Sequence, residues 1–135
     1  MNIIYIKRIS REDAKNNPHI LFIYGDNDER RGYGGLAKEL RYAKHAVGIR
    51  VKKKPTTDEN AYYVDEEYEE NIRKIKADIE TVKTIVAETP FSYIIFPADG
   101  IGTGLAQMRL RCPKTFKFLC NELMDSLDIL NGVQE

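Results

Sequence analysis

The sequence predicts an α/β fold in which helices flank a mixed, mostly parallel central sheet. Two short apolar runs, at residues 19–24 and 92–96, have the composition of strands that are covered on both faces. Between them, apolar residues recur every three or four positions over residues 65–88, as in a helix with one buried face. Because strand, loop and helix alternate along the chain, the sheet is expected to be mostly parallel.

The first half of the chain is expected to contribute three strands and at least one helix. Segments rich in β-branched and aromatic residues indicate strands, and polar clusters with proline or glycine indicate turns and loops. In order, the expected elements are a strand at residues 2–9, a turn or short helix within 10–18, a strand at 19–24, a loop at 25–34, a helix at 35–44 and a strand at 47–51.

The second half is expected to place two long helices around one strand. A polar connector with a short strand at residues 61–63 leads to the first helix, for which Asp65 is a candidate N-cap. After the strand at 92–96 and a loop at 98–104, the last helix is expected to begin at Pro113 and to stop before Asn131. The residues of this helix expected to face the core are Phe116, Leu119, Cys120, Leu123, Leu127 and Leu130.

The composition fits a single domain over residues 1–135 and argues against several functional classes. A hydrophobic fraction of 42% is enough for a core, so folding requires neither a metal nor a disulfide. The formal net charge is zero, which disfavours nucleic acid as a partner. Residues 1–58 hold 13 Lys and Arg against 7 Asp and Glu, a local excess that suits an anionic small molecule.

Signals for a metal, a cofactor or a membrane segment are missing from the sequence. The two cysteines and two histidines show neither CxxC nor HxxxH spacing, so we expect no structural zinc and no cofactor. No apolar run approaches ~18 residues and the first residues do not resemble a signal peptide, so a cytoplasmic protein without a membrane partner is expected. The long helix, with its neighbouring tyrosines, leaves a homo-oligomer open.

Seven of the nine glycines fall in two segments, residues 25–35 and residues 98–104. Each segment directly follows an apolar strand, and ligands of open α/β sheets bind at that carboxyl edge. Glycine allows positive φ and close backbone approach, so successive N–H groups can converge on a phosphate. The alternative is that the glycines only form tight turns. Neither segment matches a P-loop or the dinucleotide fingerprint G-x-G-x-x-G.

Three stretches of the chain together resemble the macrodomain family. They are GDN…RGYGGLA from residue 25, AVGIRVKKK from residue 46 and IIFPADGIGTGLA from residue 94. The likeness spans about residues 19–120 and is strongest to the compact deADP-ribosylating macrodomains and their small bacterial and phage relatives. It implies a macrodomain-like domain that binds ADP-ribose or a related NAD-derived nucleotide. Such a domain would be a sensor or a sequestering protein, as in phage counter-defence.

The resemblance also implies which residues meet the ligand. Asn27 would bond the distal ribose, and Tyr33 would stack on a ring. Backbone amides of both glycine segments would hold the diphosphate, and the residue chemistry adds Asp99 as a ribose contact and Arg109 as a phosphate clamp. The expected ligand-binding residues are Gly25, Asp26, Asn27, Tyr33, Gly34, Gly35, Asp99, Gly100, Ile101, Gly102, Thr103, Gly104 and Arg109.

Whether the chain is an enzyme is left open by its sequence. In the hydrolase branch with a lysine nucleophile an aspartate follows the G-x-G-L segment, and Ala106 stands there in this chain. The candidate catalytic residues are Asn27, Asp99 and Lys52. Two alternatives to nucleotide binding without catalysis therefore stay open. One is an ADP-ribosyl hydrolase acting on a modified macromolecule or small molecule, and the other is a non-enzymatic domain for nucleic-acid or protein interaction.

Overall fold

A four-stranded parallel sheet forms the centre of the computed structural model, which describes residues 2–32, 37–41, 43 and 45–132. The strand order is β1-β4-β2-β3, and each neighbouring pair is parallel, which confirms the predicted α/β fold. The strands are β1 (Asn2–Ile6), β2 (Ile20–Asn27), β3 (Ala46–Lys52) and β4 (Tyr93–Pro97). The helices are α1 (Arg11–Lys15), α2 (Ala37–Leu40), α3 (Tyr68–Glu88), α4 (Met108–Arg111) and α5 (Pro113–Leu127), with 3-10 turns at Glu59–Ala61 and Asp65–Glu67.

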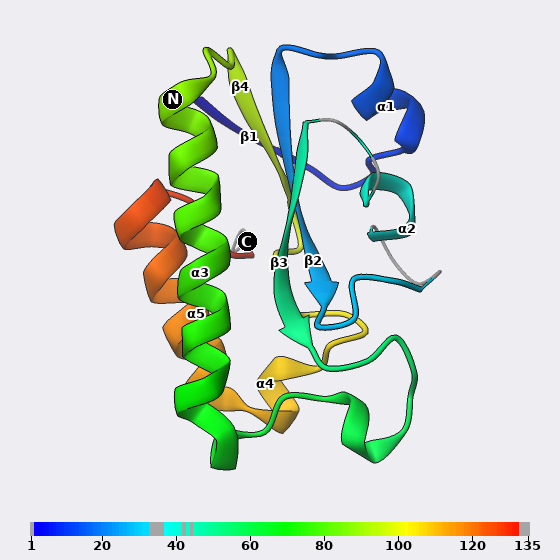
Figure 1. The fold of residues 1–135 in the computed structure, drawn as a ribbon, viewed down its shortest axis with the longest axis vertical. Coiled ribbons are helices and arrows are strands. Elements are labelled where there is room, and N and C mark those ends of the chain that lie inside the picture. The colour runs from blue at the N-terminus through cyan, green and yellow to red at the C-terminus, as the bar shows by residue number, and fades with distance from the viewer. Residues whose placement is uncertain (1, 33–36, 42, 44, 133–135) are drawn as a thin grey trace.

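Helices cover both faces of the sheet, α3 and α5 on one side and α1 and α2 on the other (Figure 1). Successive residues of a strand point to opposite faces, and β2 alternates between the two cores. Leu21 and Ile23 belong to the larger core with α3 and α5, whereas Phe22 and Tyr24 belong to the smaller core with α2. This double burial explains why the strand is apolar at every position rather than at every second one.

The predicted N-cap role of Asp65 in the long helix is wrong. The helix α3 begins only at Tyr68, after the 3-10 turn, and its N-terminus has no side-chain cap. The Asp65 carboxylate instead accepts hydrogen bonds at 2.9 Å from the N–H groups of Lys114 and Thr115. Since Cys112 offers no side-chain cap to α5, Asp65 satisfies the free amides of that helix from across the fold.

Several strands and helices begin or end at other residues than predicted, and for the strands the reason is pairing with a neighbouring strand. The strand β1 stops at Ile6 because its partner β4 ends at Pro97. Residues 25–27, predicted as loop, continue β2 because they pair with β3. Of the helix predicted at 35–44, the described part holds only α2, and the short helix α4 was not predicted.

The last helix is shorter than predicted. It ends at Leu127 because Asp128 adopts a left-handed conformation with φ 56°. The chain then turns back toward the sheet, so that Ile129 is buried and Leu130 is exposed, against the prediction that Leu130 faces the core. Asn131, predicted only to terminate the helix, becomes buried.

The two cysteines are free thiols, and Cys112 lies in the core. Burial raises the pKa of Cys112 to about 12, so this thiol is neutral at physiological pH. Across the described ranges, no cluster of three or more His, Cys, Asp or Glu could hold a metal ion. None of the described helices combines the length and the apolar character needed to span a membrane.

Candidate functional site

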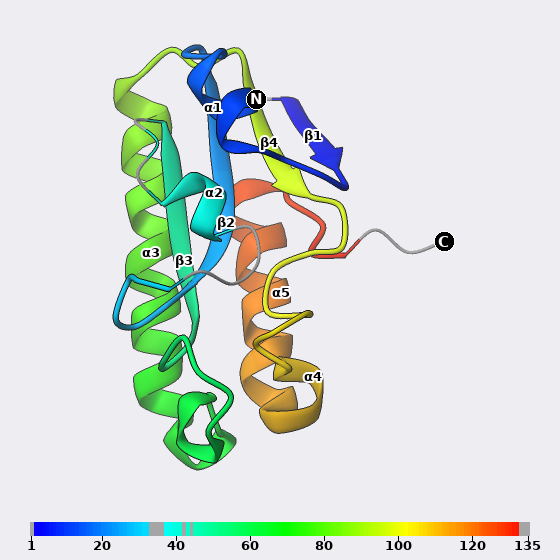
Figure 2. The ribbon, with the colours of Figure 1, turned by 90° about the vertical axis from the view of Figure 1, so that its right-hand side faces the viewer.

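A cavity of about 510 Å³ opens at the carboxyl edge of the sheet. Its wall includes residues 25–27 at the end of β2, residues 51–52 at the end of β3, residues 7–9 after β1 and residues 99–106 after β4. The chain therefore brings described residues of the first glycine segment, 25–27 and 31–32, to the same site as the second segment, as the sequence predicts for strands that end at the same edge. Figure 2 shows the segment after β4 descending past the sheet toward α4.

The glycine at position 25 lets the two segments approach each other. A Cβ atom at Gly25 would lie 3.2 Å from Cγ2 of Val51 and 3.4 Å from Cβ of Ile101. The first distance is shorter than ordinary van der Waals contact and the second is at its lower limit, so a larger residue at position 25 would require Val51, and with a longer side chain Ile101, to shift. Gly25 thus sets the close contact between the end of β2 and the second glycine segment.

The second glycine segment, residues 98–104, has a backbone that only glycine adopts readily. Gly100 and Gly102 have φ of 82° and 78°, whereas the residue between them has negative φ. The N–H of Gly100 donates to the carbonyl of Pro97 at 2.9 Å, and the carbonyl of Gly102 accepts from Met108 at 3.0 Å. Segments in which glycines with positive φ alternate with residues of negative φ can present several N–H groups to one side, as in the backbone concavities that bind anions.

Five consecutive backbone amides of this region have no hydrogen-bond acceptor within the described part of the chain. Among the described residues, no acceptor meets the N–H groups of Gly102, Thr103, Gly104, Leu105 and Ala106. All five residues line the cavity. Backbone N–H groups are obligatory donors, so they need water or a ligand as their partner.

Asn131 holds the second glycine segment in place, a role that the sequence analysis missed. Its side-chain oxygen accepts the N–H of Ile101 at 2.7 Å, and its side-chain nitrogen donates to the carbonyl of Ile101 at 3.1 Å. The side-chain amide of Asn131 therefore satisfies both backbone groups of Ile101, as a neighbouring strand would do in a sheet. No local pattern in the sequence points to a contact between residues 30 positions apart.

Replacing Asn131 by alanine is expected to lower the free energy of unfolding by about 1–3 kcal/mol, because both backbone groups of Ile101 would be buried without a partner. Urea unfolding with an unchanged m-value measures this loss. Asn121→Ala is the matched control, since Asn121 is exposed on α5. Equal midpoints for the two variants would show that Asn131 does not hold the loop.

Asp26 and Asn27 are buried at the cavity, and their side chains already have partners. The Asp26 carboxylate accepts from the Arg41 guanidinium at 2.6 Å, so its charge is balanced within the protein. The Asn27 amide donates to the carbonyl of Arg31 at 2.6 Å and accepts from the N–H of Glu29 at 3.0 Å. Both side chains shape the turn after β2, and a ribose contact by Asn27 stays a prediction.

Lys52 lines the cavity with its side chain almost fully buried. Its ammonium donates to the carbonyl of Thr56 at 2.6 Å and lies 4.8 Å from the centre of the Tyr62 ring. Burial lowers the pKa of Lys52, and the positive charge of Arg111 lowers it further. The contacts with Thr56 and Tyr62 fix the direction of this side chain at the edge of the site.

Of the remaining predicted site residues, Asp99 lies at the cavity and Arg109 does not. Asp99 lines the cavity and is exposed, and its carbonyl accepts the Thr103 hydroxyl at 3.0 Å. Arg109 is not part of the cavity wall, because α4 directs its guanidinium to the Phe116 ring, 5.1 Å away. A phosphate contact by Arg109 stays a prediction. Tyr33, Gly34 and Gly35 lie outside the described residues.

A family model matches residues 4–122 of the chain, and its description is a family of unknown function, DUF7831. The chain belongs to this family. The comparisons with curated proteins and with solved structures gave no match. The DUF7831 match includes every described residue of the cavity wall and excludes Asn131, which lies beyond its end.

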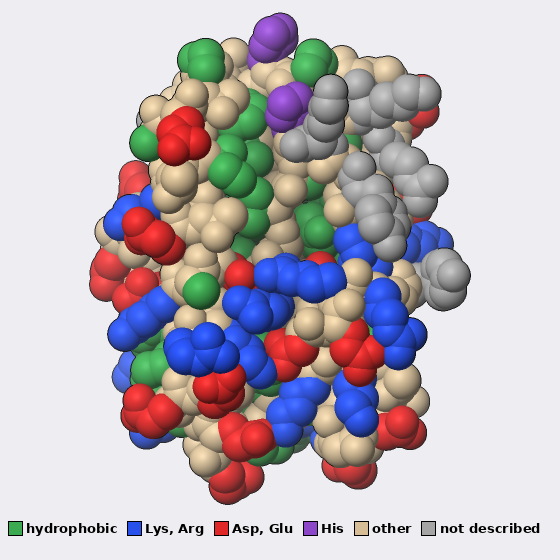
Figure 3. Space-filling model, in the orientation of Figure 1, with side chains coloured by type: hydrophobic (Ala, Val, Ile, Leu, Met, Phe, Trp, Pro, Cys, Tyr) green, Lys and Arg blue, Asp and Glu red, His purple; other side chains and the backbone are tan. Residues whose placement is uncertain are grey.

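Cationic side chains outnumber acidic ones on the cavity wall of this DUF7831 chain. The cationic residues are Lys7, Arg8, Arg31, Lys38, Arg41 and Lys52, and the acidic residues are Asp26, Glu39 and Asp99. Figure 3 shows Lys and Arg side chains, interspersed with Asp and Glu, concentrated in the lower half of the view, where β2 and β3 end. The sequence analysis missed Lys7 and Arg8 because it placed both inside the first strand.

Proposed function

We propose that this protein binds ADP-ribose or a related NAD-derived nucleotide, with the diphosphate held by backbone amides of the second glycine segment. The run of amides at residues 102–106, without an acceptor in the described part of the chain, carries this proposal. Converging N–H groups bind phosphate oxygens well because each donates a charge-assisted hydrogen bond. The same loop chemistry is what the resemblance to macrodomains implies.

The size and charge of the cavity support a nucleotide ligand. A volume of about 510 Å³ falls within the range of ~300–1,000 Å³ that is typical of small-molecule sites. Cationic side chains exceed acidic ones on its wall, and one of the acidic residues, Asp26, is neutralised by Arg41. Arg31 is paired with Glu29 at 2.6 Å, and a ligand with negative charge would offset the cations that remain.

Gly104 adds an independent argument for a ligand. Its φ is not in the left-handed region, and a Cβ atom there would meet no atom of the described residues within 4 Å. Neither backbone conformation nor packing therefore requires glycine at this position. A ligand that lies directly against the backbone would require it, since glycine is the residue that allows the closest approach.

Capture of the nucleotide, as by a sensor or a sequestering protein, fits the site better than hydrolysis. Two of the candidate catalytic groups are engaged in the structure, the Asn27 amide by the turn after β2 and the Lys52 ammonium by Thr56. Neither is poised to deliver a proton or to attack a ligand. We therefore expect the nucleotide to be recovered intact after incubation with the protein, as mass analysis would show.

Gly104→Glu is expected to weaken ADP-ribose binding about tenfold or more, because a carboxylate beside the diphosphate repels it. Isothermal titration calorimetry with ADP-ribose, NAD and AMP measures the change. The matched control is Leu110→Glu, which adds the same charge at a side chain that is 79% exposed and is not part of the cavity wall.

The proposal fails if none of these nucleotides binds to the unaltered protein, or if the two glutamate variants bind ADP-ribose equally well. The Gly104→Glu variant is expected to fold, because no atom of the described residues lies near a Cβ at this position. Weaker binding would then report on the site and not on unfolding. Thermal unfolding of both variants without ligand checks this point. If a fragment of the nucleotide were released, the function would be hydrolysis and not capture.

A further inference from the structure

Two basic residues lie at one end of the cavity. Lys7 and Arg8 directly follow β1, line the cavity and are exposed. Within the residues that the structure describes, neither side chain forms an ion pair, a side-chain hydrogen bond or a ring contact. By contrast, Arg41 and Lys52 of the same cavity wall bond to carbonyls of Gly32 and Thr56.

The strand order separates this pair from the rest of the site. The strand β1 lies at one edge of the sheet, β4 is its neighbour, and β2 and β3 follow. The N–H of Ala98 donates to the carbonyl of Ile6 at 3.0 Å, so the second glycine segment starts beside Lys7. Lys7 and Arg8 therefore flank that segment on the side away from Asn27 and Lys52.

We infer that Lys7 and Arg8 form a second anion subsite, which takes a phosphomonoester carried by the nucleotide in addition to its diphosphate. This inference rests on the proposed function and names the ligand class more closely. The guanidinium of Arg8 offers paired donors that match two oxygens of one phosphate, and the Lys7 ammonium adds a positive charge. A phosphomonoester has charge close to −2 at neutral pH, so it gains most from two cations without other partners.

The test compares nucleotides that differ by one phosphate. The probes are ADP-ribose and its two phosphorylated forms, with the added group on the adenosine ribose or on the distal ribose. At low ionic strength, at least one phosphorylated form should bind about tenfold tighter than ADP-ribose. In the double variant K7Q/R8Q, the ratio of the two dissociation constants should fall close to one.

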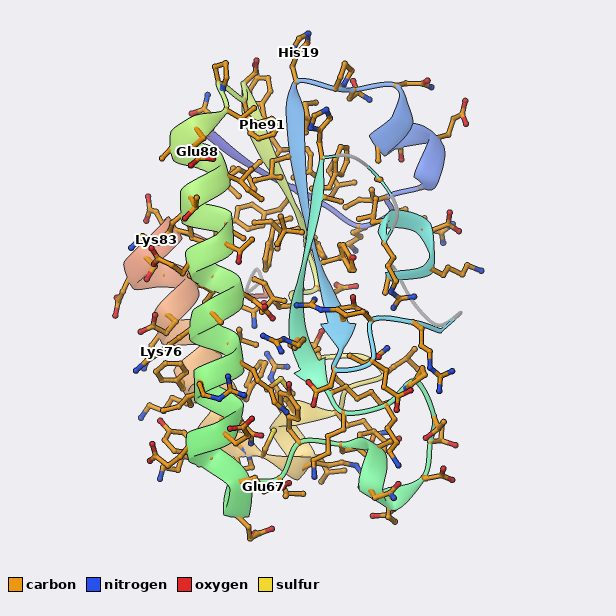
Figure 4. The ribbon with its side chains drawn as sticks, in the orientation of Figure 1. His19, Glu67, Lys76, Lys83, Glu88 and Phe91 are labelled. Carbon is orange, nitrogen blue, oxygen red and sulfur yellow. The ribbon has the colours of Figure 1, made fainter. Side chains whose placement is uncertain are left out.

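The control is the double variant K76Q/K83Q, which removes the same charge from α3. Figure 4 shows Lys76 and Lys83 on the side of α3 away from the sheet, and neither lines the cavity. This control should keep the full preference for the phosphorylated form. A preference that survives K7Q/R8Q, or that is lost equally in the control, would overturn the inference.

The result also separates this inference from the function on which it rests. If ADP-ribose binds and neither phosphorylated form binds tighter, the subsite is wrong and the nucleotide proposal stands. If no probe binds, the nucleotide proposal itself fails and the subsite fails with it. Raising the salt concentration should reduce the preference, since exposed cations are screened.

Discussion

Replacing Asp78 by alanine is expected to lower the free energy of unfolding by about 3 kcal/mol, because two guanidinium groups would lose a buried carboxylate. Asp78 lies on α3 and is buried. Its carboxylate accepts from Arg30 at 2.9 Å, and from the side chain of Arg50 at 3.0 and 3.1 Å. It also accepts the backbone N–H of Arg50 at 2.7 Å, which a β3 residue cannot easily satisfy otherwise.

The Asp78 ion pairs also connect α3 to the turn beside the cavity. Arg30 has φ 54°, and its other guanidinium nitrogen donates to the carbonyl of Gly48 at 2.6 Å. The same group lies 3.6 Å from the Asp26 carboxylate. Loss of Asp78 should therefore release the turn after β2 as well as weaken the contact between α3 and β3.

Urea unfolding of Asp78→Ala and Glu80→Ala separates this effect from a general loss of helix charge. Glu80 lies two residues away and forms an exposed pair with Lys83 at 3.7 Å. Exposed pairs of this kind contribute about 0–1 kcal/mol, so Glu80→Ala should be close to neutral. Similar losses in the two variants would show that burial of the Asp78 pairs does not matter.

The arrangement of the sheet was predictable because it follows from local patterns and from one topological rule. Continuous apolar runs indicate strands buried on both faces, and alternation with helices makes the strands parallel. Parallel strands end at the same edge, so residues 25–27 and 99–104 had to approach each other. The rule does not predict which polar atoms at that edge are already hydrogen-bonded within the protein and which can bind a ligand.

Two of the roles that the sequence did not reveal depend on partners distant in the chain. Asp65 caps a helix 49 and 50 residues away, and Asn131 bonds a loop 30 residues away. Asp26 was predicted beside the ligand, but Arg41 neutralises it once the two meet across the turn. Periodicity and motif spacing report neighbours along the chain, so they do not show whether a polar side chain is already satisfied by the fold.

Gly102→Ala is expected to lower the free energy of unfolding by about 3 kcal/mol, from strain and overpacking together. A left-handed residue other than glycine costs about 1–2 kcal/mol, and Gly102 has φ 78°. A Cβ atom there would lie 2.4 Å from the sulfur of Met108, which is fully buried. Forcing such a group into a filled core typically costs a further 1–3 kcal/mol or so.

Gly104→Ala is the control for this prediction, and the pair separates the two reasons for glycine in one loop. Among the described residues, no atom lies within 4 Å of an alanine Cβ at Gly104, so stability should stay within about 0.5 kcal/mol or rise slightly. Urea unfolding in the absence of nucleotide makes the comparison. If Gly102→Ala were as stable as Gly104→Ala, packing on Met108 would not fix the backbone of the second glycine segment. The amides of residues 102–106 would then have no fixed arrangement in which to hold a diphosphate.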